Sequence, residues 1–446
     1  MSRSRVGIFG AGWVGLVTGA CFAELGHEVV VRDVVPEKIE ALRRGEVPFF
    51  EDDVPELLVR NRDRLAFTLD VADVADCEFL FVCVDTPPTE SGDADLSRVW
   101  TVIDELPALS GNPLVVMKST VPVGTGEKVR AGLDERGLGH VGYVSNPEFL
   151  SEGRAVGDFM KPDRIVIGSF APDDAARVAS LYAALDATIV ECDVNSAEMI
   201  KLAANAFLMT RISFINEIAN VCEATGADVV KVAEGVGLDH RLGPHFLRAG
   251  IGYGGSCFPK DSLALKQLAS NSGYHFQLLS AVIEVNELQK RRVVGKLKRH
   301  LGRQLHGKTV ALLGLAFKPG TDDMREAPSI VLASRLLAEG AVVRAWDPVA
   351  DGSKLPAGVE VVRSVADAVS GADAAVIVTE WPELRGLVSP EIRDAMATPL
   401  IVDGRNLLDP EEARRAGFRY EGIGRLSSHA DSRDLAVARP EPVSEA

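Results

Sequence analysis

A cysteine in a glycine-dense stretch has the neighbours that covalent chemistry requires. Residues 250–261 read Gly-Ile-Gly-Tyr-Gly-Gly-Ser-Cys-Phe-Pro-Lys-Asp, so Lys260 and Asp261 closely follow Cys257. Glycines let backbone N–H groups approach a ligand, because they lack a Cβ and tolerate positive φ. A thiol there, beside groups that tune its pKa, is a candidate nucleophile for a carbon centre. The alternative is that Cys257 is a buried small hydrophobe, the commoner use of such a cysteine.

Three glycines near the N-terminus predict a phosphate-binding turn. An apolar strand at 5–9 leads into Gly10-Ala-Gly12-Trp13-Val14-Gly15 and an apolar helix, and the next strand, 27–32, ends on Asp33. In this fingerprint the glycines make the turn, admit the pyrophosphate and let helix and strand pack, while the acid bonds the ribose hydroxyls. The sequence therefore predicts a dinucleotide site. Asp33 favours NAD over NADP, because a 2′-phosphate would meet a like charge, and the preceding arginine weakens this preference only slightly.

Polar loops follow three further strands, predicted at 78–84, 114–118 and 142–145. They carry Thr120 and Glu148. Ligands of open α/β sheets bind beyond the carboxyl ends of the strands, so these loops are expected to form the wall of the nicotinamide site. The alternative for either side chain alone is ordinary turn and capping duty.

A stretch without Gly or Pro, residues 196–225, predicts one long helix, with Asn195 and Glu198 as a capping box. Its length suggests a spine that joins two domains and packs against a second subunit. Lys201 and Asn205 are four residues apart and share a face. The residues around Lys201 are small and apolar, so its burial would need an anionic partner. The alternative is that both side chains are solvated.

The Rossmann pattern returns in the C-terminal third, with strands predicted at 308–314, 341–346, 374–378 and 400–402. The loop after the first of them lacks the three glycines but carries Lys318 and Arg325. We interpret this part as a second doubly wound domain that holds a different ligand, with the two cations suited to a diphosphate.

Composition and net charge exclude some classes of binding partner. The chain has 446 residues, 48 of them basic and 64 acidic, and a net charge of −16, which argues against nucleic acid or anionic membrane as a general partner. The six cysteines are scattered without metal-type spacing, which favours a reduced cytoplasm and no metal site. Neither a signal peptide nor an apolar run of ~18 residues is recognised, so a cytoplasmic protein is expected.

Five linked motifs resemble the UDP-glucose/GDP-mannose dehydrogenase family, in the family's order, from the first strand to about Arg425. They are Lys118–Thr125, Asn146–Gly153, the helix with Lys201 and Asn205, Gly252–Asp261 and Phe317–Glu326. Residues 212–220 and 420–425 are most similar to the branch that oxidises UDP-glucose. One departure is Asp85-Thr-Pro-Pro, because the family usually has Asn or Gly before Thr-Pro.

The resemblance implies a four-electron oxidation of the sugar C6 alcohol to a carboxylate, with two NAD molecules used in turn. Cys257 would attack the intermediate aldehyde, and the thiohemiacetal would yield a second hydride and become a thioester. Lys201 would stabilise oxyanions at C6, with Asn205 as a neutral donor beside it. Asp261 is implied as the partner of Lys201 and of a bound water.

The resemblance also implies that Glu148 assists thioester hydrolysis and that Thr120 holds the water. The implied contacts to NAD are Gly10, Gly12, Trp13, Val14, Gly15, Asp33, Lys38, Thr86, Thr120, Glu152, Lys260 and Arg325. Those to the nucleotide-sugar are Glu148, Phe149, Leu150, Lys201, Asn205, Arg241 (from a neighbouring subunit of a homodimer or higher oligomer), Phe246, Tyr253, Gly254, Cys257, Phe317, Lys318 and Arg405.

The expected fold is α/β, with two Rossmann-like doubly wound domains joined by a long central helix and a helical middle domain. The expected bounds are 1–194 for the NAD domain, 195–303 for the helical dimerisation domain with the cysteine loop, 304–426 for the UDP-sugar domain and 427–446 for a disordered tail. An alternative substrate is GDP-mannose or a UDP-N-acetylhexosamine, which the pocket around 246–253 and Phe317 would discriminate. An NAD-bound sensor, or a two-electron 3-hydroxyacid-type dehydrogenase, would have no need of Cys257.

Overall fold

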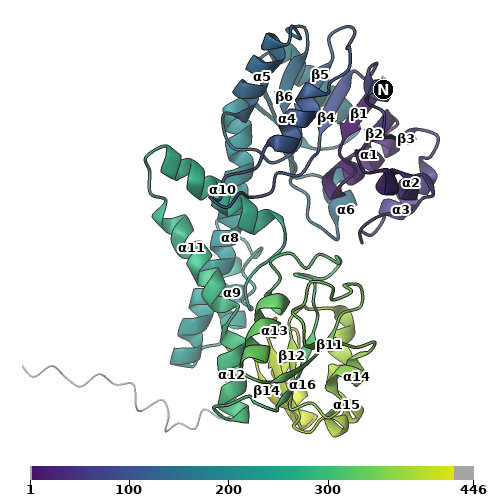
Figure 1. Ribbon diagram of the computed structural model, residues 1–446. Helices are drawn as coiled ribbons and strands as arrows, with labels where there is room; N and C mark the ends of the chain where they lie inside the picture. Colours follow the sequence, from purple (N-terminus) through teal and green to yellow (C-terminus); the bar gives the residue numbers. More distant parts are fainter. Residues whose placement is uncertain (1–2, 426–446) are drawn as a thin grey trace, which may run out of the picture. The chain divides into compact units, whose positions relative to one another are not determined.

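The structure is a computed structural model that describes residues 3–425, so the tail expected at 427–446 lies outside the described residues. The chain divides into two compact units (Figure 1). The first unit holds the described residues up to Phe207, together with Cys257–Leu279 and Gly320–Asp322. The second holds Leu208–Ser256, Ser280–Pro319 and the described residues from Asp323 onward. The division into three domains proposed from the sequence stays a prediction.

The first unit is built on an eight-stranded sheet of order β3-β2-β1-β4-β5-β6-β7-β8, in which only β6 and β7 pair antiparallel. The order reverses between β1 and β4, which is the switch point where open α/β sheets bind ligands. The strands are β1 Arg5–Phe9, β2 Glu28–Arg32, β3 Leu65–Thr68, β4 Phe79–Val82, β5 Leu114–Met117, β6 Gly142–Ser145, β7 Arg164–Ser169 and β8 Thr188–Cys192.

Helices cover both faces of this sheet, because side chains alternate along each strand. In β4, Phe79 and Phe81 join a core with α1, α3, α6 and α7, whereas Leu80 and Val82 join a core with α4 and α5. The helices are α1 Trp13–Glu24, α2 Pro36–Arg43, α3 Val54–Arg60, α4 Ser97–Asp104, α5 Thr125–Glu135, α6 Ala155–Met160, α7 Pro172–Leu181 and α10 Cys257–Asn271, with a 3-10 turn η1 at Val71–Val74. The doubly wound fold expected for this part is confirmed.

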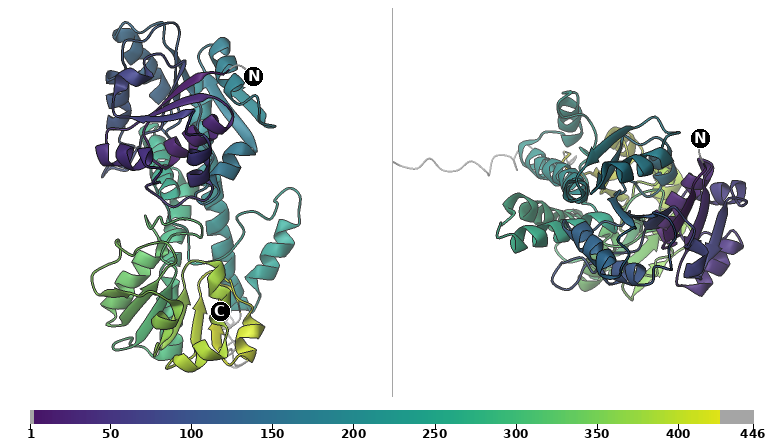
Figure 2. Two further views of the ribbon diagram at one scale, coloured as in Figure 1. Left: turned by 90° about the vertical axis from the view of Figure 1, so that its right-hand side faces the viewer. Right: turned by 90° about the horizontal axis from the view of Figure 1, so that it is seen from above.

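The long helix expected from the sequence is confirmed as α8, Val194–Thr225, which begins in the first unit and ends in the second (Figure 2). The expected capping box is wrong. Asp193 accepts a bond from the Ser196 N–H at 2.8 Å and caps the helix two residues earlier. Glu198 instead accepts bonds from the N–H groups of Gly124 and Gly126, both at 2.8 Å, and so ties α8 to the start of α5.

The second unit has a six-stranded, wholly parallel sheet of order β11-β10-β9-β12-β13-β14, which confirms a second doubly wound fold. Its strands are β9 Thr309–Leu313, β10 Val342–Trp346, β11 Val359–Val361, β12 Ala374–Ile377, β13 Leu400–Asp403 and β14 Arg419–Glu421. Its further helices are α9 Val229–Gly237, α11 Gln277–Gln289 (whose first residues belong to the first unit), α12 Arg292–Leu301, α13 Pro328–Ala338, α14 Val365–Val369, α15 Pro390–Ala395 and α16 Pro410–Arg415, with a 3-10 turn η2 at Pro382–Leu387.

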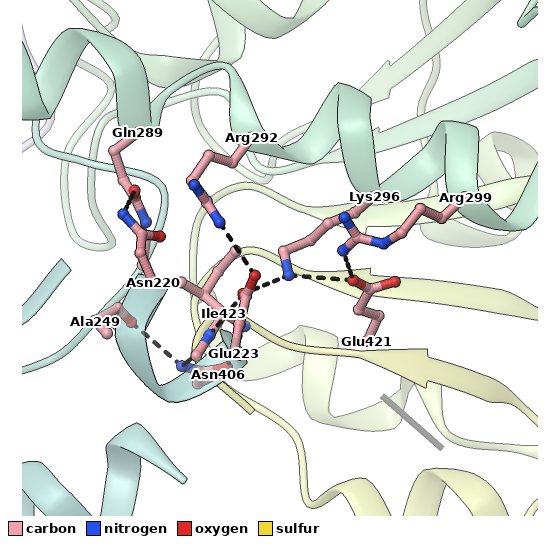
Figure 3. Close-up of polar contacts among 12 residues, drawn as sticks. Asn220, Glu223, Ala249, Gln289, Arg292, Lys296, Arg299, Asn406, Glu421 and Ile423 are labelled. Atoms are coloured by element: carbon pink, nitrogen blue, oxygen red, sulfur yellow. Dashed lines mark hydrogen bonds and ion pairs between the residues drawn. The ribbon is translucent and has the colours of Figure 1, made fainter. Parts of the chain in front are cut away.

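A buried ionic cluster holds α8, α12 and β14 together in the second unit (Figure 3). The Lys296 ammonium lies 2.5 Å from Glu223 and 3.1 Å from Glu421. Arg299 and His300 also contact the Glu421 carboxylate. Burial alone would raise the pKa of Glu421, but His300, Lys296 and Arg299 outweigh it and hold the pKa at about 2.

The described part of the chain, residues 3–425, contains no helix long and apolar enough to cross a bilayer.

Candidate active site

The thiol of Cys257 stands at the first residue of α10 and is half-buried. Close packing explains two glycines of the preceding loop. A Cβ on Gly254 would lie 2.4 Å from the Glu326 carbonyl oxygen, and one on Gly255 would lie 2.9 Å from the Phe317 ring. Burial and the nearby Glu148 raise the pKa of the Cys257 thiol to about 11, against the opposing charge of Lys201. The sulfur is therefore protonated at neutral pH, and its attack on a carbon centre requires a base.

Lys201 of α8 forms a buried ion pair with Glu148, whose loop follows β6, with 2.6 Å between Nζ and Oε1. Burial alone would lower the pKa of Lys201, but Glu148 and then Asp261 outweigh it and raise it. Burial alone would likewise raise the pKa of Glu148, but Lys201 and the Leu150 N–H, 2.6 Å from Oε2, lower it. The expectation that a buried Lys201 needs an anionic partner is confirmed. The partner is Glu148 rather than the expected Asp261, whose oxygens are held by other donors.

Asp261 is buried and accepts bonds from two side chains. Oδ2 accepts from Asn205 Nδ2 at 2.6 Å, and Oδ1 lies 2.7 Å from Lys260 Nζ. Lys260 also lies 3.4 Å from the Thr86 hydroxyl, which donates to the carbonyl oxygen of Thr120 at 2.8 Å. One chain of polar contacts therefore runs from α8 through α10 to the loops after β4 and β5. The structure brings the residues of this chain together with Cys257, Lys201 and Glu148. Together they supply N–H, carboxylate and thiol groups, which acyl-transfer and hydride-transfer reactions use.

In the fingerprint turn, two of the three glycines have no space for a side chain, and the third has space for one. A Cβ on Gly10 would lie 2.7 Å from the Cys83 carbonyl oxygen, and one on Gly15 would lie 1.9 Å from the Gly10 oxygen. A Cβ on Gly12 would meet nothing within 4 Å. Gly12 is thus the position left open for close approach of a phosphate to the first N–H groups of α1.

Asp33 stands beside this turn, where a ribose is expected. Its Oδ2 accepts from the Ala11 N–H at 2.7 Å and lies 2.9 Å from Lys38 Nζ. Burial alone would raise the pKa of Asp33, but these donors lower it, so the carboxylate is charged. Arg32 bonds Glu105 at 2.8 Å and lies over the Phe9 ring, so it does not compensate Asp33. Another cofactor candidate of this unit, Glu152, accepts a bond from the Thr321 hydroxyl at 3.1 Å.

The other substrate candidates in the first unit flank the ion pair. The Phe149 ring lies 5.6 Å from Lys201 Nζ and carries the Arg164 guanidinium 3.6 Å above it on centre. Leu150 is half-buried and donates its N–H to Glu148, so it orients that carboxylate rather than leaving it free to rotate.

The nucleotide-sugar candidates of the second unit centre on Arg405. Its guanidinium donates to the carbonyl oxygens of Val378 at 2.7 Å, Gly252 at 2.8 Å and Phe317 at 3.4 Å. Lys318 Nζ lies 5.5 Å from the centre of the Phe317 ring. Burial lowers the pKa of Arg405, yet an arginine keeps its charge, so the site presents a fixed cation.

The other candidates of the second unit are Arg241, expected in a neighbouring subunit's sugar site, Arg325, expected to contact NAD, and the aromatic residues Phe246 and Tyr253. Arg241 and Arg325 are exposed and pair with the carboxylates two residues before them, Asp239 at 2.6 Å and Asp323 at 2.8 Å. Tyr253 is buried, and Phe246 is 43% exposed with φ of 60°.

Two buried residues were given no function from the sequence, although one of them, Lys118, opens a motif of the resemblance. Lys118 directly follows β5, is buried, and donates to Asn146 Oδ1 at 3.1 Å and to the Tyr182 hydroxyl at 3.3 Å. Burial lowers its pKa to about 8. A lysine at the end of an all-apolar strand is the signal that could have identified it. Glu51 is buried in the loop before α3, and the sequence around it carries no comparable signal.

Three models of one family match the chain in order. Residues 4–186 match the NAD binding domain of the UDP-glucose/GDP-mannose dehydrogenase family, 195–288 its central domain and 311–410 its UDP binding domain. The UDP-glucose 6-dehydrogenase of Pseudomonas aeruginosa is 47% identical over 441 residues, with 94% of this chain and 97% of that protein covered. UDP-glucose 6-dehydrogenase TuaD of Bacillus subtilis is 44% identical over 430 residues, with 94% and 93% covered.

A solved UDP-glucose dehydrogenase from the hyperthermophilic archaeon Pyrobaculum islandicum superposes with a TM-score of 0.87 at 38% identity, with 95% of this chain and 98% of that chain covered. The sequence identity, the order of the matched domains and the fold therefore all indicate the same family over nearly the whole chain. The chain belongs to the UDP-glucose/GDP-mannose dehydrogenase family.

Proposed function

We propose that this protein oxidises the C6 alcohol of UDP-glucose to a carboxylate, giving UDP-glucuronate, with NAD as the oxidant. The observation that carries the proposal is a thiol, Cys257, placed in the field of the buried Lys201–Glu148 pair in the unit that holds the dinucleotide fingerprint. A nucleophilic thiol has no task in a simple alcohol oxidation. It is needed to hold an aldehyde and carry it to the acid level. The names of the two relatives above specify UDP-glucose.

The chemistry is two oxidations at one carbon followed by hydrolysis. NAD, when bound, accepts a hydride in each oxidation. In the first, a base takes the hydroxyl proton as the hydride leaves C6, and an aldehyde remains. The Cys257 sulfur then bonds to C6 while its proton passes to a neighbouring base, giving a thiohemiacetal. Loss of the second hydride and of the hydroxyl proton gives a thioester, and water cleaves the C–S bond to return the thiol and the acid.

Four other side chains support these steps. The Lys201 ammonium, kept charged by Glu148, stabilises negative charge on the C6 oxygen. Asn205 adds a neutral donor beside it. Asp261 holds a water together with its partner Lys260. Glu148 then assists the attack of water on the thioester as an ionised carboxylate, since its lowered pKa keeps it free of a proton of its own.

The assembly is proposed to be a homodimer or a higher oligomer. Phe207, Phe214 and Val221 on α8 are 63%, 53% and 56% exposed, and their spacing of seven puts them on one face of the helix. An apolar stripe of this kind is typical of an interface, and a two-fold dimer is its commonest closed solution. Arg241 is exposed and, within residues 3–425, pairs with Asp239, so it is then available to a neighbouring subunit's sugar site.

The test is the NADH yield per sugar across a panel of nucleotide-sugars. We expect two NADH per UDP-glucuronate formed, and the highest kcat/KM with UDP-glucose. Cys257→Ser should stop near the aldehyde or ester stage, because an alkoxide is a poorer leaving group than a thiolate. One NADH per sugar with free aldehyde as the product would refute the four-electron reaction. A higher kcat/KM with GDP-mannose or a UDP-N-acetylhexosamine would assign the chain to that substrate instead.

A further inference from the structure

Glu51 joins three segments of the first unit through one buried carboxylate. Its Oε2 accepts bonds from Trp13 Nε1 and from the Gly153 N–H, each at 2.7 Å. Its Oε1 accepts a bond from the Ala155 N–H at 2.8 Å. The residue itself is 3% exposed and stands in the loop between α2 and α3.

The three donors belong to parts of the unit with different tasks. Trp13 is the first residue of α1 and directly follows Gly12, the open position of the fingerprint turn. Gly153 lies in the loop between β6 and α6 that also carries Glu148, and it has φ of 79°, in the left-handed region that favours glycine. Ala155 begins α6, so its N–H is one of the donors that a helix leaves unsatisfied at its start. Glu51 thus spans the distance between the dinucleotide turn and the loop of the catalytic carboxylate.

The chemistry of this junction requires a carboxylate. Three N–H donors converge on two oxygens, and a carboxylate has acceptor sites on both. A glutamine at this position would turn an NH₂ group toward at least one N–H and break that bond. Because the site is buried, the donor left without a partner would lose its bond without gaining water, and the loop would have to move.

We propose that Glu51 is a positioning residue that couples the phosphate-binding turn at Gly12–Trp13 to the loop that carries Glu148. Binding of the cofactor at the turn and placement of the catalytic carboxylate then depend on the same side chain. The Trp13 indole is the link on the cofactor side, and the Gly153 and Ala155 N–H groups are the link on the catalytic side. The inference rests on the proposed function only for the turnover measurement, since the coupling itself concerns the cofactor.

The experiment is a double-mutant cycle with Trp13→Phe, Glu51→Gln and both together. Trp13→Phe removes the indole N–H and leaves an aromatic ring. Asp52→Asn is the matched control, because Asp52 is the exposed acid next in sequence. The measurements are the Kd for NAD by calorimetry without sugar, and KM for NAD and kcat with saturating UDP-glucose. The fraction of folded protein in each sample is measured by near-ultraviolet circular dichroism.

We expect each single variant to lower kcat/KM for NAD by about five- to tenfold, the loss of one buried hydrogen bond. The double variant should fall no further than Glu51→Gln alone, and Asp52→Asn should match wild type. If the two single losses multiply in the double variant, the residues act independently and the proposal is wrong. If the folded variants keep wild-type Kd, KM and kcat and only melt earlier, Glu51 is structural and the proposal is equally wrong.

If Glu51→Gln does not fold, the proposal is tested with Trp13→Phe alone. Coupling predicts a fall in kcat of about threefold or more at saturating NAD, in addition to a higher KM. A higher KM with unchanged kcat would confine Trp13 to the cofactor turn and overturn the coupling. Failure of the proposed function looks different, because wild-type protein would then not oxidise UDP-glucose while the calorimetric cycle for NAD could still be completed.

Discussion

At the residue scale, the resting sulfur of Cys257 is a thiol, because burial and Glu148 raise its pKa to about 11. Thiolate is the nucleophilic form, which reacts with oxidants and alkylating agents. A protonated sulfur is therefore protected while the site is empty of substrate. Its proton must leave when the aldehyde arrives, and the buried Lys201 ammonium is the charge nearby that favours the anion.

Alkylation of Cys257 is expected to rise steeply with pH. Below the thiol pKa, the thiolate fraction grows about tenfold per pH unit, so the iodoacetamide rate should increase about a hundredfold from pH 7 to pH 9. Peptide mass spectrometry would follow Cys257 separately from the half-buried Cys192. Cys257→Ser supplies the background rate. A rate at Cys257 that does not change over this range would mean that the thiolate is already formed at neutral pH.

The preference for NAD is expected to depend on Asp33. Its carboxylate is kept charged by Lys38 and the Ala11 N–H, and it would repel a 2′-phosphate. Asp33→Asn should reduce the ratio of kcat/KM for NAD over NADP by about tenfold, or ~1.4 kcal/mol. Arg32→Gln is the control and should leave the ratio unchanged, because Arg32 pairs with Glu105. Wild-type protein that prefers NADP would contradict this role for Asp33.

At the element scale, several strands with strong apolar patterns were predicted, although β7 was missed with four of its six residues buried. The predicted strands at 78–84, 114–118 and 142–145 are confirmed as β4, β5 and β6, since their apolar residues are buried on both faces. β8 was not predicted, because four of its five residues are exposed and give no burial signal. The length of α8 followed from its lack of Gly and Pro. Its N-terminal cap did not, because Glu198 bonds α5, a contact that local sequence does not contain.

The same limit applies to the site. Sequence spacing placed Lys201 and Asn205 on one face, and both reach the site. It could not select the partner of Lys201, because Glu148 is 53 residues away along the chain and Asp261 is equally acidic. Which of the two carboxylates pairs with Lys201 depends on how the loop of Glu148 and helix α10 pack. Glu51 was missed for that reason too, since its three donors come together only in the folded unit.

The ionic cluster of α8, α12 and β14 is expected to give the second unit a pH-dependent stability. Glu421 has a pKa of about 2 in the fold, against the ordinary value of 4.5 for a glutamate side chain. A carboxyl that binds its proton more weakly when folded stabilises the fold where it is ionised, here by about 3 kcal/mol above pH ~4.5. This contribution is lost as the pH falls from about 4.5 to 2.

Glu421→Gln tests it through the midpoint of urea denaturation. The variant should be clearly less stable than wild type at pH 7, and the gap should narrow as the pH is lowered toward 3. Lys231→Gln is a control, because the Lys231–Glu234 pair is exposed and surface pairs contribute little. An equal gap at pH 7 and pH 3 would mean that the charge of Glu421 is not the source of the stabilisation.

At the scale of the whole molecule, the proposed oligomer predicts that activity depends on the exposed apolar stripe on α8. Phe214→Glu should weaken the interface, because it places a charge within the stripe of Phe207 and Val221. We expect light scattering to show a mass near 47.7 kDa for the variant and a larger one for wild type. Turnover of UDP-glucose should fall by at least tenfold if Arg241 completes a neighbouring subunit's site.

Phe170→Glu is the matched control for this change, since Phe170 is 49% exposed but lies after β7, away from α8 along the chain. It should keep both the mass and the turnover of wild type. A fully active wild-type sample with a mass near 47.7 kDa would contradict the assembly.

The first unit is assembled from three separate stretches of chain, and this determines the order in which its parts are synthesised. Translation delivers the fingerprint turn, Glu148 and Lys201 by Phe207, so the buried ion pair is available to the nascent chain first. The thiol and Asp261 follow only after the stretch from Leu208 to Ser256, several seconds later at about 5–20 residues per second. Thr321, the partner of Glu152, emerges later still. A chain interrupted before residue 257 therefore carries a cofactor turn but no nucleophile, so unfinished copies are unable to trap an aldehyde.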